Sequence, residues 1–97
     1  MKIRLKLYGA FRSAANTTEL RILLAGEHPT VKSVISELTK DSQLRARKQL
    51  LLDSETSDPR PNALIMVSGR EINALNGLDT ELKEDDEISL LPVAHGG

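Results

Sequence analysis

The first eight residues alternate strictly between aliphatic and polar side chains, and this alternation constrains the fold more than any other feature. Aliphatic residues hold every second position and charged or aromatic residues stand between them: Ile3, Leu5 and Leu7 against Lys2, Arg4, Lys6 and Tyr8. Successive side chains of a strand point to opposite faces, so the segment is predicted to be a β-strand with one buried face. Another element has to cover that face.

A single amphipathic helix is predicted to provide the cover. Its apolar residues recur at the spacing i, i+3, i+4 and i+7, which places them on one stripe: Val31, Val34, Ile35 and Leu38. Thr30 precedes the stripe and is suited to cap the first turn. A second, short helical segment is expected around Leu44 and Leu51, followed by a polar, proline-bearing loop over residues 53–61.

Three further strands and one brief pairing are expected. Residues 18–22 alternate and read as the return strand of a hairpin whose longish loop spans residues 9–16. Residues 63–67 form a short apolar run, interpreted as a central strand buried on both sides. Residues 71–72 pair back briefly, Asn76-Gly77 marks a turn, and the last strand, residues 88–91, is stopped by Pro92.

This order of elements predicts an α+β domain with the β-grasp architecture, a mixed sheet packed on one main helix. Its first and last strands then lie side by side in the middle of the sheet. If Leu5 and Leu90 face the helix, the two-residue period turns Tyr8 and Leu91 outward. We expect one domain over residues 1–92 and a flexible tail over residues 93–97.

Composition excludes several classes of function. There is no cysteine, which removes thiolate chemistry and disulfides and fits a cytoplasmic protein. Thirteen basic and fourteen acidic residues give a net charge of −1, which disfavours a nucleic-acid partner. No apolar run approaches the roughly 20 residues that span a bilayer, so no membrane contact is expected.

The chain also lacks a recognisable catalytic or metal site. Its two histidines, His28 and His95, stand far apart without neighbouring ligands at metal-binding spacing, so we expect no metal. The acidic run from Glu84 to Glu87 is more typical of a solvated turn than of acid–base catalysis. The glycines form no phosphate-binding motif, and no cofactor is expected to be bound.

The last two residues, Gly96 and Gly97, are the feature with a chemical use. Terminal glycines can be no more than a frayed end. Lacking Cβ atoms, however, they allow an extended chain to enter a narrow channel and present its carboxylate. Five residues beyond Pro92 reach about 16 to 18 Å, and outward Tyr8 and Leu91 near the root of this tail would anchor a partner.

Four segments together closely resemble the MoaD/ThiS family of ubiquitin-like sulfur carriers. These are residues 3–12, 68–72, 75–82 and the closing block of residues 86–97. The His-Gly-Gly ending is also similar to that of ubiquitin-related modifiers and small archaeal modifier proteins. Asp85 stands where relatives often have a glycine in the turn before the last strand. Aspartate tolerates the left-handed backbone conformation of such a turn less well than glycine but better than most residues.

The resemblance implies a carrier without catalytic activity. A ubiquitin-activating-type enzyme would use ATP to adenylate the Gly97 carboxylate, and a sulfur donor would convert the adenylate to a thiocarboxylate. The sulfur would go to a molybdopterin precursor in molybdenum cofactor biosynthesis, through a molybdopterin synthase large subunit, to a tRNA-thiolating enzyme, or to another acceptor. Tyr8, Leu91, Pro92 and Gly96 fall where relatives contact partners. The alternative is a protein modifier joined through Gly97 to substrate lysines.

Overall fold

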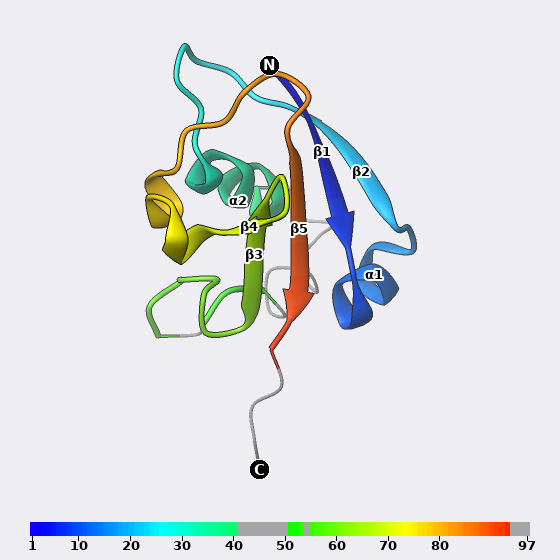
Figure 1. Ribbon diagram of the computed structural model, residues 1–97. Coiled ribbons are helices and arrows are strands. Elements are labelled where there is room, and N and C mark those ends of the chain that lie inside the picture. Colours follow the sequence, from blue (N-terminus) through cyan, green and yellow to red (C-terminus); the bar gives the residue numbers. More distant parts are fainter. Residues whose placement is uncertain (41–50, 54, 94–97) are drawn as a thin grey trace.

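The computed structural model describes residues 1–40, 51–53 and 55–93, which form one sheet, two α-helices and two short 3₁₀ turns (Figure 1). The strands are β1 (Lys2–Leu7), β2 (Glu19–Leu23), β3 (Ala63–Val67), β4 (Arg70–Glu71) and β5 (Glu87–Pro92). The helices are α1 (Gly9–Ala15) and α2 (Val31–Thr39), and the 3₁₀ turns are η2 (Ile72–Ala74) and η3 (Gly77–Asp79).

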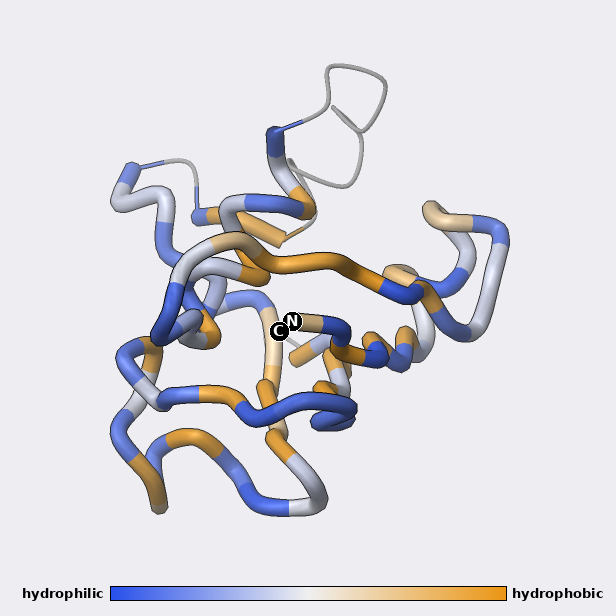
Figure 2. The backbone as a smooth tube through the Cα atoms, turned by 90° about the horizontal axis from the view of Figure 1, so that it is seen from above, coloured by the Kyte–Doolittle hydropathy of each residue, from blue (hydrophilic) through white to orange (hydrophobic). Residues whose placement is uncertain are grey.

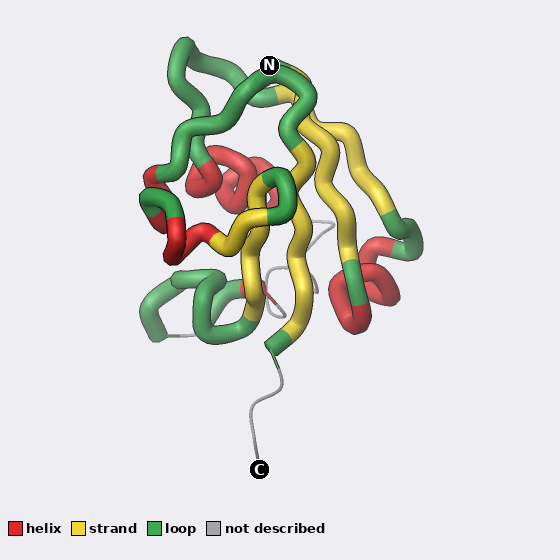
Figure 3. Tube along the Cα trace, viewed as in Figure 1, coloured by secondary structure: helices red, strands yellow, loops and turns green. Residues whose placement is uncertain are grey.

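The sheet is mixed, with the strand order β2-β1-β5-β3-β4. The first and last strands run parallel at its centre, with Leu5 beside Ile88 and Leu7 beside Leu90, and every other neighbouring pair is antiparallel. The strands lie in one layer with α2 behind them (Figure 3). This arrangement confirms the predicted α+β, β-grasp architecture and the central pairing of the two terminal strands.

One face of the sheet and the apolar stripe of α2 form the core. Hydrophobic and hydrophilic residues are interspersed along the backbone (Figure 2), and the inward positions of β1, β3 and β5 are almost fully buried. They are Ile3, Leu5, Leu7, Ala63, Ile65, Val67, Ile88 and Leu90. All four predicted helix residues, Val31, Val34, Ile35 and Leu38, are buried against them. The prediction of this helix is confirmed.

Local hydrogen bonds explain where α2 begins. The backbone N–H of Thr30 donates to Ser33 Oγ at 3.1 Å, and the Ser33 N–H donates to the Thr30 carbonyl at 3.0 Å. Thr30 is extended, with φ −121°, so the chain changes direction at this residue. These bonds satisfy groups that the first turn leaves without helical partners.

The connection between the first two strands was predicted wrongly as a loop. Residues 9–15 are the helix α1, which has only one buried residue, Phe11. A single anchor gives no helical period, so the pattern did not indicate a helix. The segment is held by tertiary contact with β5, and it ends at Asn16, whose φ of +54° is left-handed.

The prediction for β3 was also wrong in one respect. This strand was expected to be central and buried on both sides, but it is the fourth of five, and its side chains alternate in burial. Leu64 is 39% exposed and Met66 is partly exposed, while Ile65 is 1% exposed. The reason is that α2 covers only one face of the sheet, so an all-apolar strand leaves every second side chain on the open face.

The remaining predictions have mixed outcomes. The brief pairing at residue 71 is the strand β4, and Asp85 has the expected left-handed backbone, with φ +65°. The turn at Asn76-Gly77 is the start of η3. Pro92 is the last residue of β5 and pairs with Ala63. The expected helical segment around Leu44 and Leu51 falls largely on residues 41–50, outside the described residues.

Candidate functional site at the carboxyl end of the central strand

The open face of the sheet carries an apolar patch at the end where β5 finishes. Leu64 and Leu91 are direct cross-strand partners, and the Tyr8 N–H donates to the Leu90 carbonyl at 3.2 Å, which brings Tyr8 beside Leu91. Tyr8 is 43% exposed and Leu91 is partly buried. With Met66, one row further along β3, these residues make up what we call the apolar patch: Tyr8, Leu64, Met66 and Leu91.

Half of this patch was predicted from the sequence. Tyr8 and Leu91 follow from the two-residue period of β1 and β5, and the structure brings them together as expected. Leu64 and Met66 were missed because β3 was interpreted as buried on both sides. A continuous run of apolar residues contains no signal for which face is open, so the strand order was needed to find them.

The other half of the open face is charged. Glu87 Oε1 lies 3.1 Å from Lys6 Nζ and 3.5 Å from Arg4 Nη1, so one carboxylate on β5 serves two cations on β1. The hydrogen bond and the charge of Glu87 raise the pKa of Lys6 above its ordinary value. Arg21 lies directly opposite Arg4 on β2. The open face therefore changes from charged to apolar along the direction of β5.

The end of β5 is held on both of its sides. The ring of Pro92 lies against Gly9 at the start of α1, and the Val93 N–H donates to the Asn62 carbonyl at 3.0 Å. The exposed Pro92 therefore borders the apolar patch. Gly97, the predicted reactive residue, and Gly96, a predicted partner contact, lie outside the described residues, as does His95.

Other candidate chemistry finds no support in the part of the chain that the structure describes. Within it, no group of three or more His, Asp or Glu residues is placed to hold a metal ion. The carboxylate of Asp86 accepts from the Lys83 N–H at 2.7 Å and from Ser68 Oγ at 3.1 Å, so it closes the turn before β5. This agrees with the interpretation of the acidic run as a turn.

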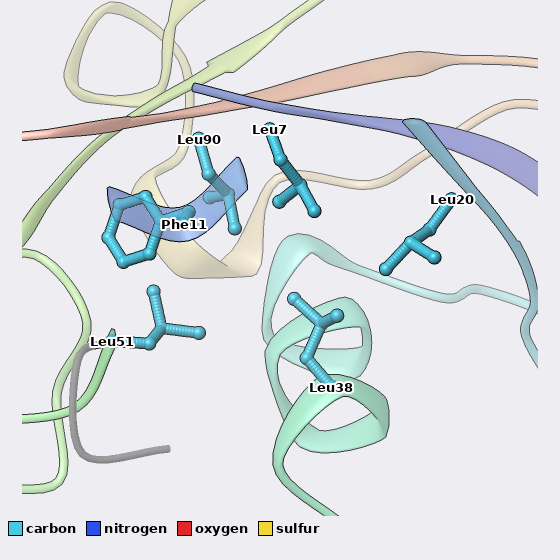
Figure 4. Close-up of a pocket in the computed structure, with 6 residues that line it drawn as sticks. All are labelled: Leu7, Phe11, Leu20, Leu38, Leu51 and Leu90. Carbon is cyan, nitrogen blue, oxygen red and sulfur yellow. The ribbon is translucent and has the colours of Figure 1, made fainter. Parts of the chain in front are cut away.

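A small, partly open apolar pocket is equally unsuited to a ligand. It measures about 20 Å³ and lies between the sheet and the helices (Figure 4). Six apolar side chains point toward it: Leu7, Phe11, Leu20, Leu38, Leu51 and Leu90. A water molecule would need two or more polar partners there, and these side chains offer none. We regard it as a packing gap in the core.

Comparison with known proteins identifies the family. The model of the ThiS family matches residues 5–97. The chain belongs to the ThiS family. Among curated proteins, a candidate sulfur carrier protein of Archaeoglobus fulgidus is 31% identical over 86 residues, which cover 89% of this chain and 94% of that protein. This family is one of non-catalytic sulfur carrier proteins.

Two solved structures of modifier proteins share the fold of this ThiS-family member. Small archaeal modifier protein 1 from Methanosarcina acetivorans is 33% identical, with a TM-score of 0.79 and coverage of 99% of this chain and 96% of that one. The protein of the same name from Haloferax volcanii has a TM-score of 0.81 over the full length of both chains at 18% identity, which shows the shared fold alone.

Among the described residues, no helix is both long enough and apolar enough to cross a bilayer.

Proposed function

We propose that this protein carries sulfur on the C-terminal carboxyl group of Gly97. In the first step the Gly97 carboxylate attacks the α-phosphorus of ATP and pyrophosphate leaves, which forms a mixed anhydride with AMP. In the second step the sulfur of a hydrosulfide donor attacks the acyl carbon and AMP leaves with one carboxyl oxygen, so that a thiocarboxylate remains. The anhydride is needed because a free carboxylate is a poor electrophile and lacks a good leaving group.

The position of the apolar patch is the observation that carries this proposal. The patch lies at the end of the sheet where β5 leads into the closing residues, and Pro92 borders it. A partner that covers Tyr8 and Leu91 is therefore next to the point where the chain leaves the sheet. Clustered aromatic and aliphatic side chains of this kind supply most of the binding energy in protein interfaces.

The partner that we propose for this surface is a ubiquitin-activating-type adenylating enzyme, which binds the ATP. The carrier then needs no nucleotide site of its own, and its sequence has no motif for one. After sulfur transfer, the same surface would dock an acceptor, either a molybdopterin synthase large subunit or a tRNA-thiolating enzyme. In this scheme the folded domain is bound by successive partners, and each binding event brings Gly97 to an active site.

A second function is favoured by a specific similarity. The Methanosarcina acetivorans relative, at 33% identity, is named as a modifier protein. The adenylate of Gly97 can be attacked by the amine of a substrate lysine, with loss of AMP and formation of an isopeptide bond. Both functions share the adenylation step and differ only in the nucleophile, which another protein provides.

Mass spectrometry of the protein from its own cells separates the two functions. Replacement of one terminal oxygen by sulfur supports the carrier, whereas a branched peptide in which residues 84–97 remain on a substrate lysine after trypsin digestion supports the modifier, because Lys83 is the last tryptic site before Gly97. If sulfur-replete cells contain neither product, both proposals fail and the chain is an interaction domain with an inert end.

Deletion of Gly97 tests the reactive residue itself. We expect the truncated protein to fold normally, because the described core contains no residue beyond Leu90. We also expect it to lose ATP–pyrophosphate exchange with its activating enzyme. Exchange at the wild-type rate would contradict the assignment of Gly97.

A further inference from the structure

The ring of Pro92 occupies the space that a side chain on Gly9 would need. A Cβ atom built on Gly9 would lie 2.7 Å from Cγ and 3.3 Å from Cδ of Pro92. The first distance is well inside van der Waals contact. Gly9 also has a φ of +53°, which side-chain-bearing residues adopt only at a cost. Two separate constraints therefore require glycine at the start of α1.

The opposite side of the same segment is held by hydrogen bonds. The Val93 N–H donates to the Asn62 carbonyl at 3.0 Å, one residue beyond the last strand pair, Ala63 with Pro92. Asn62 is itself fixed, because its N–H donates to the Pro59 carbonyl at 3.0 Å and its Nδ2 donates to the Leu51 carbonyl at 3.3 Å. The root of the closing segment is thus confined between α1 and the turn before β3.

The other described glycines with positive φ lack such a neighbour. At Gly26 and Gly69 a Cβ atom would meet no other atom within 4 Å, and at Gly77 the nearest atom would be Arg60 Nη1 at 4.0 Å. Gly77 has a φ of +59°, close to that of Gly9. A methyl group at Gly77 therefore reproduces the backbone cost of a methyl group at Gly9 without the collision.

We propose that Gly9 and Asn62 are positioning residues that hold Pro92 and Val93 in one orientation, so that the closing residues start from a fixed place beside the apolar patch. This inference rests on the proposed adenylation of Gly97. The carboxylate must reach the α-phosphorus in a near-attack geometry while the patch stays docked, and a displacement of Val93 moves the point from which it has to reach. Small displacements of this kind cost up to about 10²-fold in rate.

A double-mutant cycle tests the proposal through ATP–pyrophosphate exchange. The variants are Gly9→Ala, Pro92→Ala and the double variant, with Gly77→Ala as the matched control. We expect Gly9→Ala to lower kcat by about tenfold or more and to leave KM within about twofold, because docking through the patch persists. In the Pro92→Ala background the same change should have little effect, since the colliding ring is gone. Gly77→Ala should behave as wild type.

Asn62→Ala tests the other side of the segment. It keeps the carbonyl that binds Val93 but removes the Nδ2 bond to Leu51, so we expect a smaller fall in kcat in the same direction. Equal losses in Gly9→Ala and Gly77→Ala, or a loss confined to KM, would overturn the positioning role.

Hydrogen exchange of the Val93 amide tests the same idea without any enzyme. The bond to Asn62 protects this amide, and Gly9→Ala should speed its exchange whereas Gly77→Ala should not. Unchanged protection in Gly9→Ala contradicts the proposal even if that variant is inactive. If wild-type protein shows no pyrophosphate exchange, the proposed adenylation fails, and the Val93 measurement still decides whether Gly9 holds the root.

Discussion

The two faces of the sheet come from the same alternating strands, yet they differ in how their residues are distributed. The inner face is aliphatic throughout and nearly fully buried, from Ile3 on β1 to Ile65 on β3. The outer face is divided into a charged half around Glu87 and an apolar half around Tyr8 and Leu64. A core has to be filled evenly, so uniformity on the inner face is what folding requires.

The division of the outer face has no such explanation. Water accepts a mixture of polar and isolated apolar side chains on a surface, so folding does not require the apolar ones to cluster at the end of β5. The inner face is therefore explained by stability, whereas the outer face is where binding is expected. The following substitutions test this separation, in order of decreasing effect.

The largest effect is expected on the inner face. Leu5 is 0% exposed at the centre of the core, and Leu5→Ala leaves a cavity that the surrounding strands cannot close. We expect the free energy of unfolding to fall by about 2 to 5 kcal/mol, measured by chemical denaturation. Leu23→Ala is the control, because Leu23 is 70% exposed and its loss should change stability by less than about 0.5 kcal/mol. Equal losses would contradict the distinction between the faces.

Tyr8→Asp should have its main effect on binding rather than on folding. The aspartate places a charge in the apolar patch, and we expect the affinity for the activating enzyme to weaken by about 1 to 3 kcal/mol, measured by titration calorimetry. Leu23→Asp, at the far end of the outer face, serves as the control and should bind normally. Unchanged affinity in Tyr8→Asp would remove Tyr8 from the interface.

Leu64→Ser examines the part of the patch that the strand order revealed. Leu64 pairs with Leu91, so its loss should weaken the same binding by about 1 kcal/mol while thermal unfolding stays nearly unchanged. If Leu64→Ser and Tyr8→Asp affect only binding, the outer face serves binding and the inner face serves folding. A large loss of stability in Leu64→Ser would show that the outer face also supports the core.

The smallest effect is expected in the charged half. Glu87→Gln removes the partner of Lys6 and Arg4, and we expect the unfolding temperature to fall by about 1 to 3 °C, less in high salt. The pKa of Lys6 is raised above 10.5 in the folded state, so this contribution is present below pH 10.5 and is lost as the pH rises through the folded pKa. The difference between wild type and variant should therefore shrink in alkaline unfolding scans, and the part due to Arg4 should remain because arginine stays charged. A difference that does not shrink there would contradict the pairing of Glu87 with Lys6.

Periodicity predicted those elements that have several anchors. The stripe from Val31 to Leu38 has four, and β1 has three, so each could be identified without knowledge of its neighbours. α1 has only Phe11 as a buried anchor, and its helical form depends on contact with β5. For the candidate site, Tyr8 and Leu91 were predicted because both stand in or next to alternating strands, whereas Leu64 stands in a run that is apolar at every position.

Local sequence patterns are enough to identify the buried residues of β1, β5 and α2, because the period of the apolar side chains selects one face of each element. The sequence also contains the Gly96-Gly97 ending and excludes thiol chemistry. The grouping of Leu64 with Tyr8 and Leu91, and the contact of Gly9 with Pro92, arise from the tertiary fold. Both join residues far apart in the chain, and they depend on strand order and on the one face that α2 leaves open, which no local pattern records.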